Sequence, residues 1–339
     1  MTPDALQGKR IVLTGAAGFI GFHLANRLLQ AGAHVHGIDN LDPYYDVALK
    51  EARLAAIAPR AQFAFTRADI AEPGRLRALF SSYRPDYVVH MAAQAGVRHS
   101  LVDPGAYTHA NIDGFLAVLE ACRAHPVRHL LYASSSSVYG ASAAVPFSES
   151  DPADRPLSLY AATKRAGELM AYSYAHLFRI PATALRFFTV YGPWGRPDMA
   201  LFTFTRAILE GNPIDVFNAG RMQRDFTYID DVAQAVVRLV PRAPDERRQG
   251  TSESGPTVPH AIFNIGNHTA IPLDRFIAAI EAALGRSAIR RNLPMQPGDV
   301  PATFADVSRL AEAVGFAPST PIEDGVRRFV AWYRTFYGV

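Results

Sequence analysis

The chain contains 339 residues, 49% of them apolar and 19% charged, and at roughly 100–200 residues per domain this length predicts two or three structural units. The net charge of +3 is not concentrated in any basic run, which argues against a nucleic-acid surface. A single cysteine, Cys122, excludes an internal disulfide and a cysteine-ligated metal. No apolar run is long enough to span a membrane, and the N-terminus lacks the pattern of a signal peptide. We therefore expect a cytoplasmic protein without a metal site.

The first half of the chain alternates short β-branched apolar runs with longer segments of helical period. The runs that predict strands are Arg10–Thr14, His34–Ile38, Gln62–Thr66, Tyr87–His90, His129–Ser134 and Ala182–Phe187. The segments that predict helices are Phe19–Ala31, Ala48–Ile57, Gly74–Ser82, Pro104–Ala124 and Leu159–Phe178. This alternation is typical of an α/β protein with a doubly wound parallel sheet, a Rossmann-like fold with helices on both faces.

The pattern changes after Tyr191, where a stretch rich in glycine and proline should leave the sheet. Beyond it the sequence predicts a helix, three short strands and two terminal helices, at Leu201–Glu210, Ile214–Phe217, Phe226–Ile229, Ile262–Ile265, Val307–Val314 and Ile322–Tyr337. The polar segment Pro241–Pro259 is expected to be an exposed loop. We therefore expect a Rossmann domain of residues 1–191 plus about 222–265, interleaved with a smaller C-terminal α/β substrate domain of about 192–221 plus 266–339.

A glycine-rich turn follows the first predicted strand, in the sequence Gly15-Ala16-Ala17-Gly18-Phe19-Ile20-Gly21. This turn has the features of the dinucleotide-binding fingerprint. Its glycines permit a tight turn and let the backbone approach a pyrophosphate closely, and the N-terminus of the next helix faces that pyrophosphate. The alternative is an ordinary tight turn between a strand and a helix. We expect Gly15, Gly18, Phe19, Ile20 and Gly21 to contact the cofactor.

Acidic residues at the ends of the second and third predicted strands bear on the identity of this cofactor. Asp39 lies about 20 residues beyond the glycines, where a carboxylate can bind both ribose hydroxyls, and neither Asn40 nor Leu41 offers a cation for a 2′-phosphate. NAD is therefore favoured over NADP, with Asn40 beside the ribose. Asp69 and Ile70 are predicted to contact the adenine, although an aspartate here could equally cap a helix.

The pair Tyr160 and Lys164 opens a predicted helix, and the i, i+4 spacing puts phenol and ammonium on one face. With 14 tyrosines and three lysines, chance predicts roughly 0.12 such pairs, so an ordinary surface pair is the weaker interpretation. Ionising a phenol at pH 7 costs about 4 kcal/mol, and a neighbouring ammonium and the nicotinamide cation both favour phenolate. We therefore predict that Tyr160 is a general base for a hydroxyl undergoing oxidation.

Four serines, Ser134 to Ser137, end the fifth predicted strand. The carboxyl ends of parallel strands face the ligand in a doubly wound sheet, so these hydroxyls can hydrogen-bond a substrate, and none is a strong acid. A polar loop with capping serines is the alternative.

On the strength of these motifs, the chain resembles the extended short-chain dehydrogenase/reductase family over nearly its whole length. Within that family it most resembles the nucleotide-sugar epimerase branch, and in particular the UDP-glucuronate 4-epimerases. The glycine turn and the Tyr160/Lys164 pair indicate only the superfamily. The other stretches that carry the resemblance are Val89–Arg98, Ser134–Gly140, Arg186–Ala200, Arg224–Asp231 and Met295–Val300, of which Pro193–Ala200 and Met295–Val300 are the most specific.

The resemblance implies roles for individual residues. Ser135 would hydrogen-bond the sugar 4-hydroxyl beside the catalytic tyrosine. Further cofactor contacts would come from Ala92, Ala93, Gln94 and Asn111, and the substrate would be bound by Arg98, Ser136, Ser137, Thr189, Arg196, Phe217, Arg224 and Asp299. The family also implies a homodimer, formed by the helices Pro104–Ala124 and Leu159–Phe178.

The reaction implied is reversible inversion at C4 of UDP-glucuronate through a 4-keto sugar, with NAD recycled. A 4-keto uronate is a β-keto acid that loses CO₂ readily, so its carboxylate must be held, and Arg196 is the best candidate for a bidentate clamp, assisted by Ser136, Ser137 and Arg98. The alternative for Arg196 is a solvated loop charge.

Two departures bear on the substrate. UDP-galactose 4-epimerases usually have Asn where this chain has Thr189 and Arg where it has Gln296, which makes simple UDP-galactose activity doubtful. The serines at 136 and 137 replace the carboxylates of sugar dehydratases and UDP-glucuronate decarboxylases. The alternatives left open are an epimerase for another UDP-hexose, a decarboxylase, and a catalytically silent dinucleotide-binding regulator.

Overall fold

The computed structural model describes residues 5–142, 145–244, 258–295 and 302–339. Within them, seven parallel strands form the main sheet in the order β10–β6–β5–β4–β1–β2–β3. The strands are β1 Arg10–Thr14, β2 His34–Asp39, β3 Phe63–Arg67, β4 Tyr87–His90, β5 His129–Ser135, β6 Ala182–Phe187 and β10 His260–Ile265. The strand order reverses between β1 and β4, and such a reversal leaves a crevice at the carboxyl ends where ligands bind.

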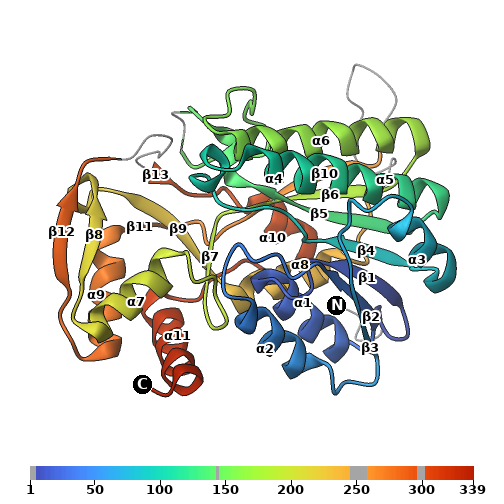
Figure 1. The fold of residues 1–339 in the computed structure, drawn as a ribbon. Helices are drawn as coiled ribbons and strands as arrows, with labels where there is room; N and C mark the ends of the chain where they lie inside the picture. The colour runs from blue at the N-terminus through green and yellow to red at the C-terminus, as the bar shows by residue number, and fades with distance from the viewer. Residues whose placement is uncertain (1–4, 143–144, 245–257, 296–301) are drawn as a thin grey trace.

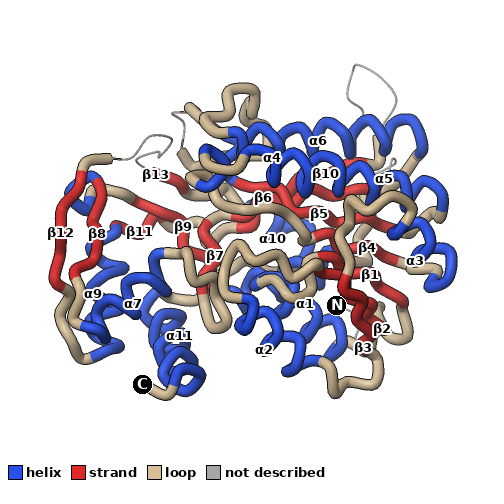
Figure 2. The backbone as a smooth tube through the Cα atoms, in the orientation of Figure 1, coloured by secondary structure: helices blue, strands red, loops and turns tan. Residues whose placement is uncertain are grey.

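Helices cover both faces of this sheet, as predicted (Figures 1 and 2). One face carries α4 Pro104–Thr108, α5 Gly114–Ala124 and α6 Leu159–Phe178, with α3 Arg75–Tyr83 against α5; the other carries α1 Phe19–Gln30, α2 Val47–Ile57, α8 Ile229–Leu239 and α10 Ser308–Val314. Burial on both sides explains why the central strands read as continuous apolar runs, such as Ile11–Leu13, whose side chains are fully buried.

A smaller lobe lies beside the carboxyl ends of the main sheet (Figure 1). Its described strands are β7 Thr189–Tyr191, β8 Pro213–Phe217, β9 Gln223–Tyr228, β11 Ala270–Pro272, β12 Ile289–Leu293 and β13 Ala302–Thr303. The strand β9 pairs with β7, β11 and β13, and β12 pairs with β8. The helices α7 Ala200–Glu210, α9 Leu273–Leu284 and α11 Ile322–Tyr337 pack around these strands, and α9 contacts both of the others.

The chain passes between the two parts several times. After the small-lobe strand β9, helix α8 packs on α1 and β10 joins the main sheet beside β6, before the chain returns to β11. The predicted division into two domains, which assigned residues 222–265 to the Rossmann part, stays a prediction. Of the segment Pro241–Pro259, residues 245–257 lie outside the described residues.

The main differences from the predicted elements are a broken helix and several missed segments. The expected helix Pro104–Ala124 changes to π geometry at His109–Asp113, between α4 and α5. Helices α8 and α9 and the strands β7, β11, β12 and β13 were not predicted. Cys122 is fully buried in α5. No helix in the described parts of the chain combines the length and apolarity needed to cross a membrane.

Candidate active site

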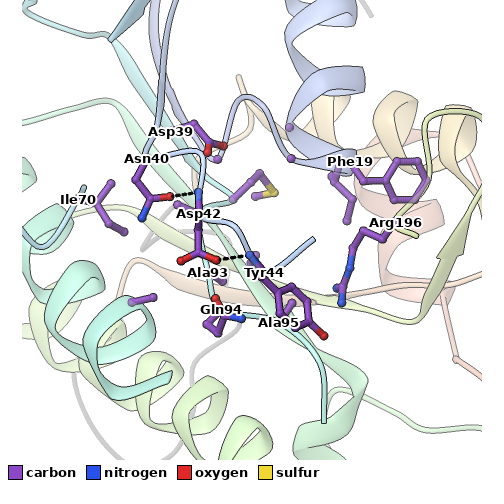
Figure 3. Close-up of a pocket in the computed structure, with 18 of the residues that line it drawn as sticks. Phe19, Asp39, Asn40, Asp42, Tyr44, Ile70, Ala93, Gln94, Ala95 and Arg196 are labelled. Atoms are coloured by element: carbon purple, nitrogen blue, oxygen red, sulfur yellow. Dashed lines mark hydrogen bonds between the residues drawn. The ribbon is translucent and has the colours of Figure 1, made fainter. Parts of the chain in front are cut away.

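A cavity of about 320 Å³ opens at the carboxyl ends of β1, β2, β4 and β5, where the strand order reverses. Figure 3 shows residues from β2, the loop after β4 and the small-lobe side facing one another across it. Sixteen of the predicted site residues line it: Gly15, Gly18, Phe19, Ile20, Gly21, Asp39, Asn40, Asp69, Ile70, Ala92, Ala93, Gln94, Ser135, Tyr160, Lys164 and Arg196.

The glycine turn forms a cradle that side chains could not occupy. Gly15 has φ +70°, and a Cβ built on it would lie 2.6 Å from the Ala92 backbone nitrogen. A Cβ on Gly21 would overlap the carbonyl oxygen of Gly15. Gly18, the N-cap of helix α1, offers no side-chain cap, so the first N–H groups of the helix remain available to a ligand. These features fit the pyrophosphate of a dinucleotide.

Asp39 is buried at the end of β2, and each carboxylate oxygen accepts one backbone N–H, from Ala17 at 3.0 Å and from Leu41 at 2.9 Å. Burial raises the pKa of this carboxyl, while the two backbone hydrogen bonds and the charges of Lys50 and Arg53 act in the opposite direction. The second lone pair of each oxygen stays available, which fits the predicted contact with ribose hydroxyls.

Two cations beside Asp39 were missed in the sequence. Lys50 lines the cavity, donates to the Asp42 carbonyl at 2.7 Å, and has its pKa lowered by burial. Arg53 is fully buried and donates to the carbonyls of Ala17 and Trp194 at 2.9 and 2.7 Å. Because both come from helix α2, spacing from the strand end gave no signal for them. The sequence-based prediction considered only Asn40 and Leu41, which offer no cation, and did not extend to these two residues of α2.

The adenine end of the predicted site contains Asp69, whose Oδ1 accepts the Ala71 N–H at 2.8 Å, while Asn40 donates to its Oδ2 at 3.1 Å. Burial acts to raise the pKa of Asp69, but these hydrogen bonds and one with His109 outweigh it, so the pKa is lowered. Asp69 lines the cavity as predicted, and its hydrogen bond with the Ala71 N–H belongs to a turn and not to a helix cap, because the N-cap of α3 is Gly74.

Tyr160 and Lys164 lie on the first turns of α6, which starts at a Ser158 side chain that accepts the Ala161 N–H at 3.1 Å. The Lys164 ammonium donates to the Ala133 carbonyl at 3.0 Å and lies 6.0 Å from the centroid of the Tyr160 ring. Burial lowers the pKa of Lys164 to about 8.

The pKa of the Tyr160 phenol depends on its burial as well as on its neighbours. Burial raises its pKa, and a hydrogen bond with Ser135 and the positive charge of Arg196 oppose this rise. The prediction overlooked desolvation, which disfavours the charged form of a buried group. It identified Lys164 as the neighbouring cation and missed the contribution of Arg196.

Asn111 fixes the relation between the loop after β4 and helix α6. Its amide donates to the Gln94 carbonyl and to the Thr163 hydroxyl, both at 3.0 Å, and its carbonyl oxygen accepts the Gln94 N–H at 2.9 Å. This residue lies in the π segment, and such bulges are frequent at functional sites. Asn111 thus fixes Gln94, which lines the cavity, relative to Thr163 of the catalytic helix α6.

The serine segment divides its hydroxyls between two tasks. Ser134 lines the first cavity but donates its hydroxyl proton to the buried Glu168 carboxylate at 2.6 Å, so that proton is already in use. Ser135 donates to the Ser137 hydroxyl at 3.2 Å. The predicted substrate residues Ser136, Ser137, Thr189 and Arg224 line a second cavity of about 160 Å³.

The remaining predicted substrate residues are placed differently. The Arg98 guanidinium lies 4.9 Å from the centroid of the Phe217 ring, so these two residues pack on each other. Asp299 and Gln296 lie outside the described residues. Arg196 forms an ion pair with Asp198 through its Nε and Nη2, and this edge of the fork is therefore already in use.

Comparison with known proteins agrees with this geometry. Residues 11–266 match the family model described as the NAD dependent epimerase/dehydratase family. The chain belongs to this family. It is 48% identical to the Probable UDP-glucuronate 4-epimerase of Rhizobium meliloti, over 97% of this chain and 98% of that protein. It is also 44% identical to UDP-glucuronate 4-epimerase 2 of Arabidopsis thaliana, over 97% of this chain and 77% of that protein.

A crystal structure of a UDP-glucuronic acid 4-epimerase from Bacillus cereus, in complex with UDP-glucuronic acid and NAD, superposes on the chain with a TM-score of 0.87. The two sequences are 33% identical, and the match covers 97% of this chain and 100% of that one. Membership of the epimerase/dehydratase family and the parallel main sheet confirm the predicted superfamily and fold class.

Proposed function

We propose that the protein interconverts UDP-glucuronate and UDP-galacturonate by inverting C4 of the sugar, with NAD as its bound cofactor. The observation that carries this proposal is the position of Tyr160, Ser135 and Arg196 around one cavity that begins at the glycine turn. A base for a hydroxyl, a partner for that hydroxyl and a cation for a carboxylate suit oxidation of a uronic acid. The similarity to the Bacillus cereus enzyme supports the same substrate.

The residues that would hold NAD are those of the glycine cradle, Asp39 with its neighbours Asn40 and Lys50, and Asp69 with Ile70. The chemistry that NAD supplies when bound is reversible hydride exchange with the sugar C4, so the cycle has no net redox change. Lys164 is aimed at the same end of the cavity by its bond to the Ala133 carbonyl.

Removal of the 4-hydroxyl proton is assigned to Tyr160. Its phenolate is disfavoured by burial and favoured by the Ser135 hydrogen bond and the charge of Arg196. Ser135 is also near enough to the phenol to share the sugar hydroxyl with it. When the ketone is reduced again on its other face, the same phenol returns the proton.

The carboxylate at C6 distinguishes this reaction from its alternatives. Loss of CO₂ from a 4-keto uronate requires the C5–C6 bond to align with the ketone, and a cation that fixes the carboxylate prevents that alignment. Arg196 lines the cavity beside Tyr160, whereas positions 136 and 137 carry hydroxyls without any carboxylate to assist elimination or decarboxylation. This pattern favours epimerisation over decarboxylation. The uridine diphosphate is assigned to the second cavity with Arg224, and to Arg98, Phe217 and Asp299.

The test is to incubate the purified protein with UDP-glucuronate, without added NAD, and to follow the sugar signals by NMR. UDP-galacturonate should accumulate, whereas failure to form any C4 epimer would overturn the proposal. A UDP-pentose product would show that the carboxylate is not held. Parallel incubations with UDP-glucose and UDP-N-acetylglucosamine test the alternative substrates, and faster epimerisation of either would contradict uronate specificity.

We further propose that the protein acts in the cytoplasm as a homodimer that pairs α5 and α6 with their copies. These adjacent helices expose a row of large apolar side chains, and surfaces of this kind mark protein–protein contacts. The exposed residues are Leu116, Leu169, Tyr172, Leu177 and Phe178. Light scattering of the wild type and of Leu169→Glu tests this assembly. The wild type should have the mass of a dimer, and the charged variant should dissociate more readily into monomers.

A further inference from the structure

Arg196 is held by a series of hydrogen bonds that starts on the cofactor side of the cavity. After β2, Asn40 Oδ1 accepts the Asp42 N–H at 3.0 Å, and Asp42 Oδ1 accepts the Tyr44 N–H at 2.9 Å (Figure 3). Two consecutive side-chain turns therefore fix Tyr44. Its hydroxyl donates to Asp198 Oδ2 at 3.1 Å.

The pairing of Arg196 with Asp198 uses one edge of the guanidinium. Nε donates to Oδ1 at 3.0 Å and Nη2 donates to Oδ2, while the guanidinium carbon lies 5.9 Å from the centroid of the Tyr44 ring. Neither of the two hydrogen bonds with Asp198 uses Nη1. Because Arg196 lines the cavity, the Nη1 end remains for a ligand there.

The backbone of the loop after β4 also packs closely against Tyr44 and Arg196. Gly96 has φ +108°, and a Cβ built on it would lie 2.8 Å from the Tyr44 hydroxyl oxygen and 3.7 Å from Arg196 Nη2. Figure 3 shows Tyr44 and Arg196 side by side next to Ala95 of that loop. Burial and the negative charge of Asp198 raise the pKa of Tyr44, so its hydroxyl stays a donor at neutral pH.

We propose that Asp198 and Tyr44 are positioning residues that make the site specific for a sugar acid. Asp198 and Tyr44 hold the guanidinium of Arg196 in one orientation. Its Nε and Nη2 atoms are then bound to Asp198, and its Nη1 atom faces the C6 carboxylate of the substrate. This inference rests on the proposed function, and it assigns roles to two residues that the sequence did not single out.

Fixing Arg196 in advance changes both the entropy cost of binding and the direction from which a carboxylate can approach. An arginine side chain loses much rotamer freedom when it is fixed, and a partner that fixes it beforehand spares the substrate that loss. The planar fork then meets a carboxylate in one orientation only. In addition, the negative charge of Asp198 repels a second carboxylate from the closed edge, so the substrate carboxylate is directed to the Nη1 end.

The experiment compares Asp198→Asn and Tyr44→Phe with the wild type in the full-length protein. The control is Asp215→Asn, which makes the same change in an exposed pair with Arg291 in the smaller lobe. Steady-state kinetics with UDP-glucuronate are measured by NMR, and calorimetry with UDP-glucuronate and with UDP-glucose measures binding independently of turnover.

We expect Asp198→Asn to raise KM for UDP-glucuronate about 10- to 100-fold, as loss of a hydrogen bond to a charged group does, with a smaller change in kcat. Tyr44→Phe should raise it about threefold to tenfold, since the ion pair survives. Both variants should release more CO₂ from the 4-keto intermediate: the C5–C6 bond breaks, its electron pair forms the C4–C5 enolate, and C5 takes up a proton. The 4-keto pentose that is left takes the hydride back at C4, which gives a UDP-pentose. Binding of UDP-glucose, which lacks the carboxylate, should change less than twofold.

Equal losses for UDP-glucuronate and UDP-glucose would show that Asp198 only supports the fold, and tighter binding of UDP-glucuronate by Asp198→Asn would show that it competes with the substrate. Either result overturns the positioning role, as does a variant indistinguishable from Asp215→Asn. Absence of epimerisation by the wild type would instead refute the proposed function, so the two failures can be told apart.

Discussion

The two sides of the cavity are built in different ways. The cofactor side is formed mostly by backbone: the glycine turn, the start of α1 and the loop after β4 approach so closely that a single methyl group would not fit. The substrate side is formed by side chains from distant segments, with Ser135 from β5, Tyr160 from α6 and Arg196 from the loop after β7. The first depends on the shape of the chain and the second on charges and hydroxyls, so different substitutions should disable them.

The largest effect is expected at the reacting group. Tyr160→Phe removes the base and should lower kcat by about 10²–10⁴-fold. Because the variant removes only an oxygen atom at the cavity wall, NAD content and the Kd for UDP-glucuronate should stay within a few-fold of the wild type. Quenched NMR assays and calorimetry measure the two quantities, and a kcat within tenfold of the wild type would remove Tyr160 from its role.

A second substitution tests the charged support beneath the substrate side. Glu168 lies one helical turn beyond Lys164 and is buried with Arg186, which donates to its two carboxylate oxygens at 2.9 Å. Glu168→Gln leaves the Arg186 charge buried without its counter-ion and should lower the free energy of unfolding by about 3–5 kcal/mol in urea titrations. The exposed pair Arg275–Glu323 is the control, for which Glu323→Gln should cost less than about 1 kcal/mol.

The same ion pair predicts a dependence of stability on pH. Burial acts to raise the pKa of Glu168, but the hydrogen bonds and charge of Arg186 outweigh it, so the pKa in the folded state is lowered. Its contribution to stability is therefore complete above the unfolded-state value of about 4.3 and is lost as pH falls through the folded-state pKa. Wild type should lose more stability than Glu168→Gln when thermal unfolding is compared between pH 6 and pH 3.

A methyl group should break the cofactor side. Gly15 and Gly74 have almost the same φ, +70° and +76°, but a Cβ on Gly15 meets the backbone of Ala92 whereas one on Gly74 has no atom within 4 Å. Gly74→Ala should cost about 1–2 kcal/mol from its left-handed backbone alone. Gly15→Ala should cost about 1–3 kcal/mol more and should be purified with less NAD. Equal costs would show that the close approach to Ala92 is unimportant.

The smallest expected effect concerns the ribose end. Lys50→Met keeps most of the packing of the side chain and removes the ammonium beside Asp39, so NAD should dissociate about tenfold more easily while the stability of the protein without NAD changes little. Equilibrium dialysis against NAD measures this change. Unchanged retention would place the ribose contact on Asp39 alone.

The parts of the site that local sequence pattern identifies differ from the parts that depend on contacts between distant segments. The glycine turn directly follows β1 and Asp39 is the last residue of β2, so local pattern identified them, and the i, i+4 spacing identified Tyr160 with Lys164. Contacts across the fold had no such signal: Lys50 reaches the cavity from α2, and Ser134 turns to Glu168, which is 34 positions away. Helices α8 and α9 are both strongly amphipathic, so their apolar periodicity is a local signal that the predicted elements left out.

The position of β10 also has a consequence for the synthesis of the chain. This strand completes the main sheet beside β6, yet it leaves the ribosome roughly 70 residues after β6, a delay of several seconds at about 5–20 residues per second. During that interval the edge of β6 has no strand to pair with, and bare strand edges invite association with other chains. A nascent chain that stops before residue 260 should therefore be the form most dependent on chaperones.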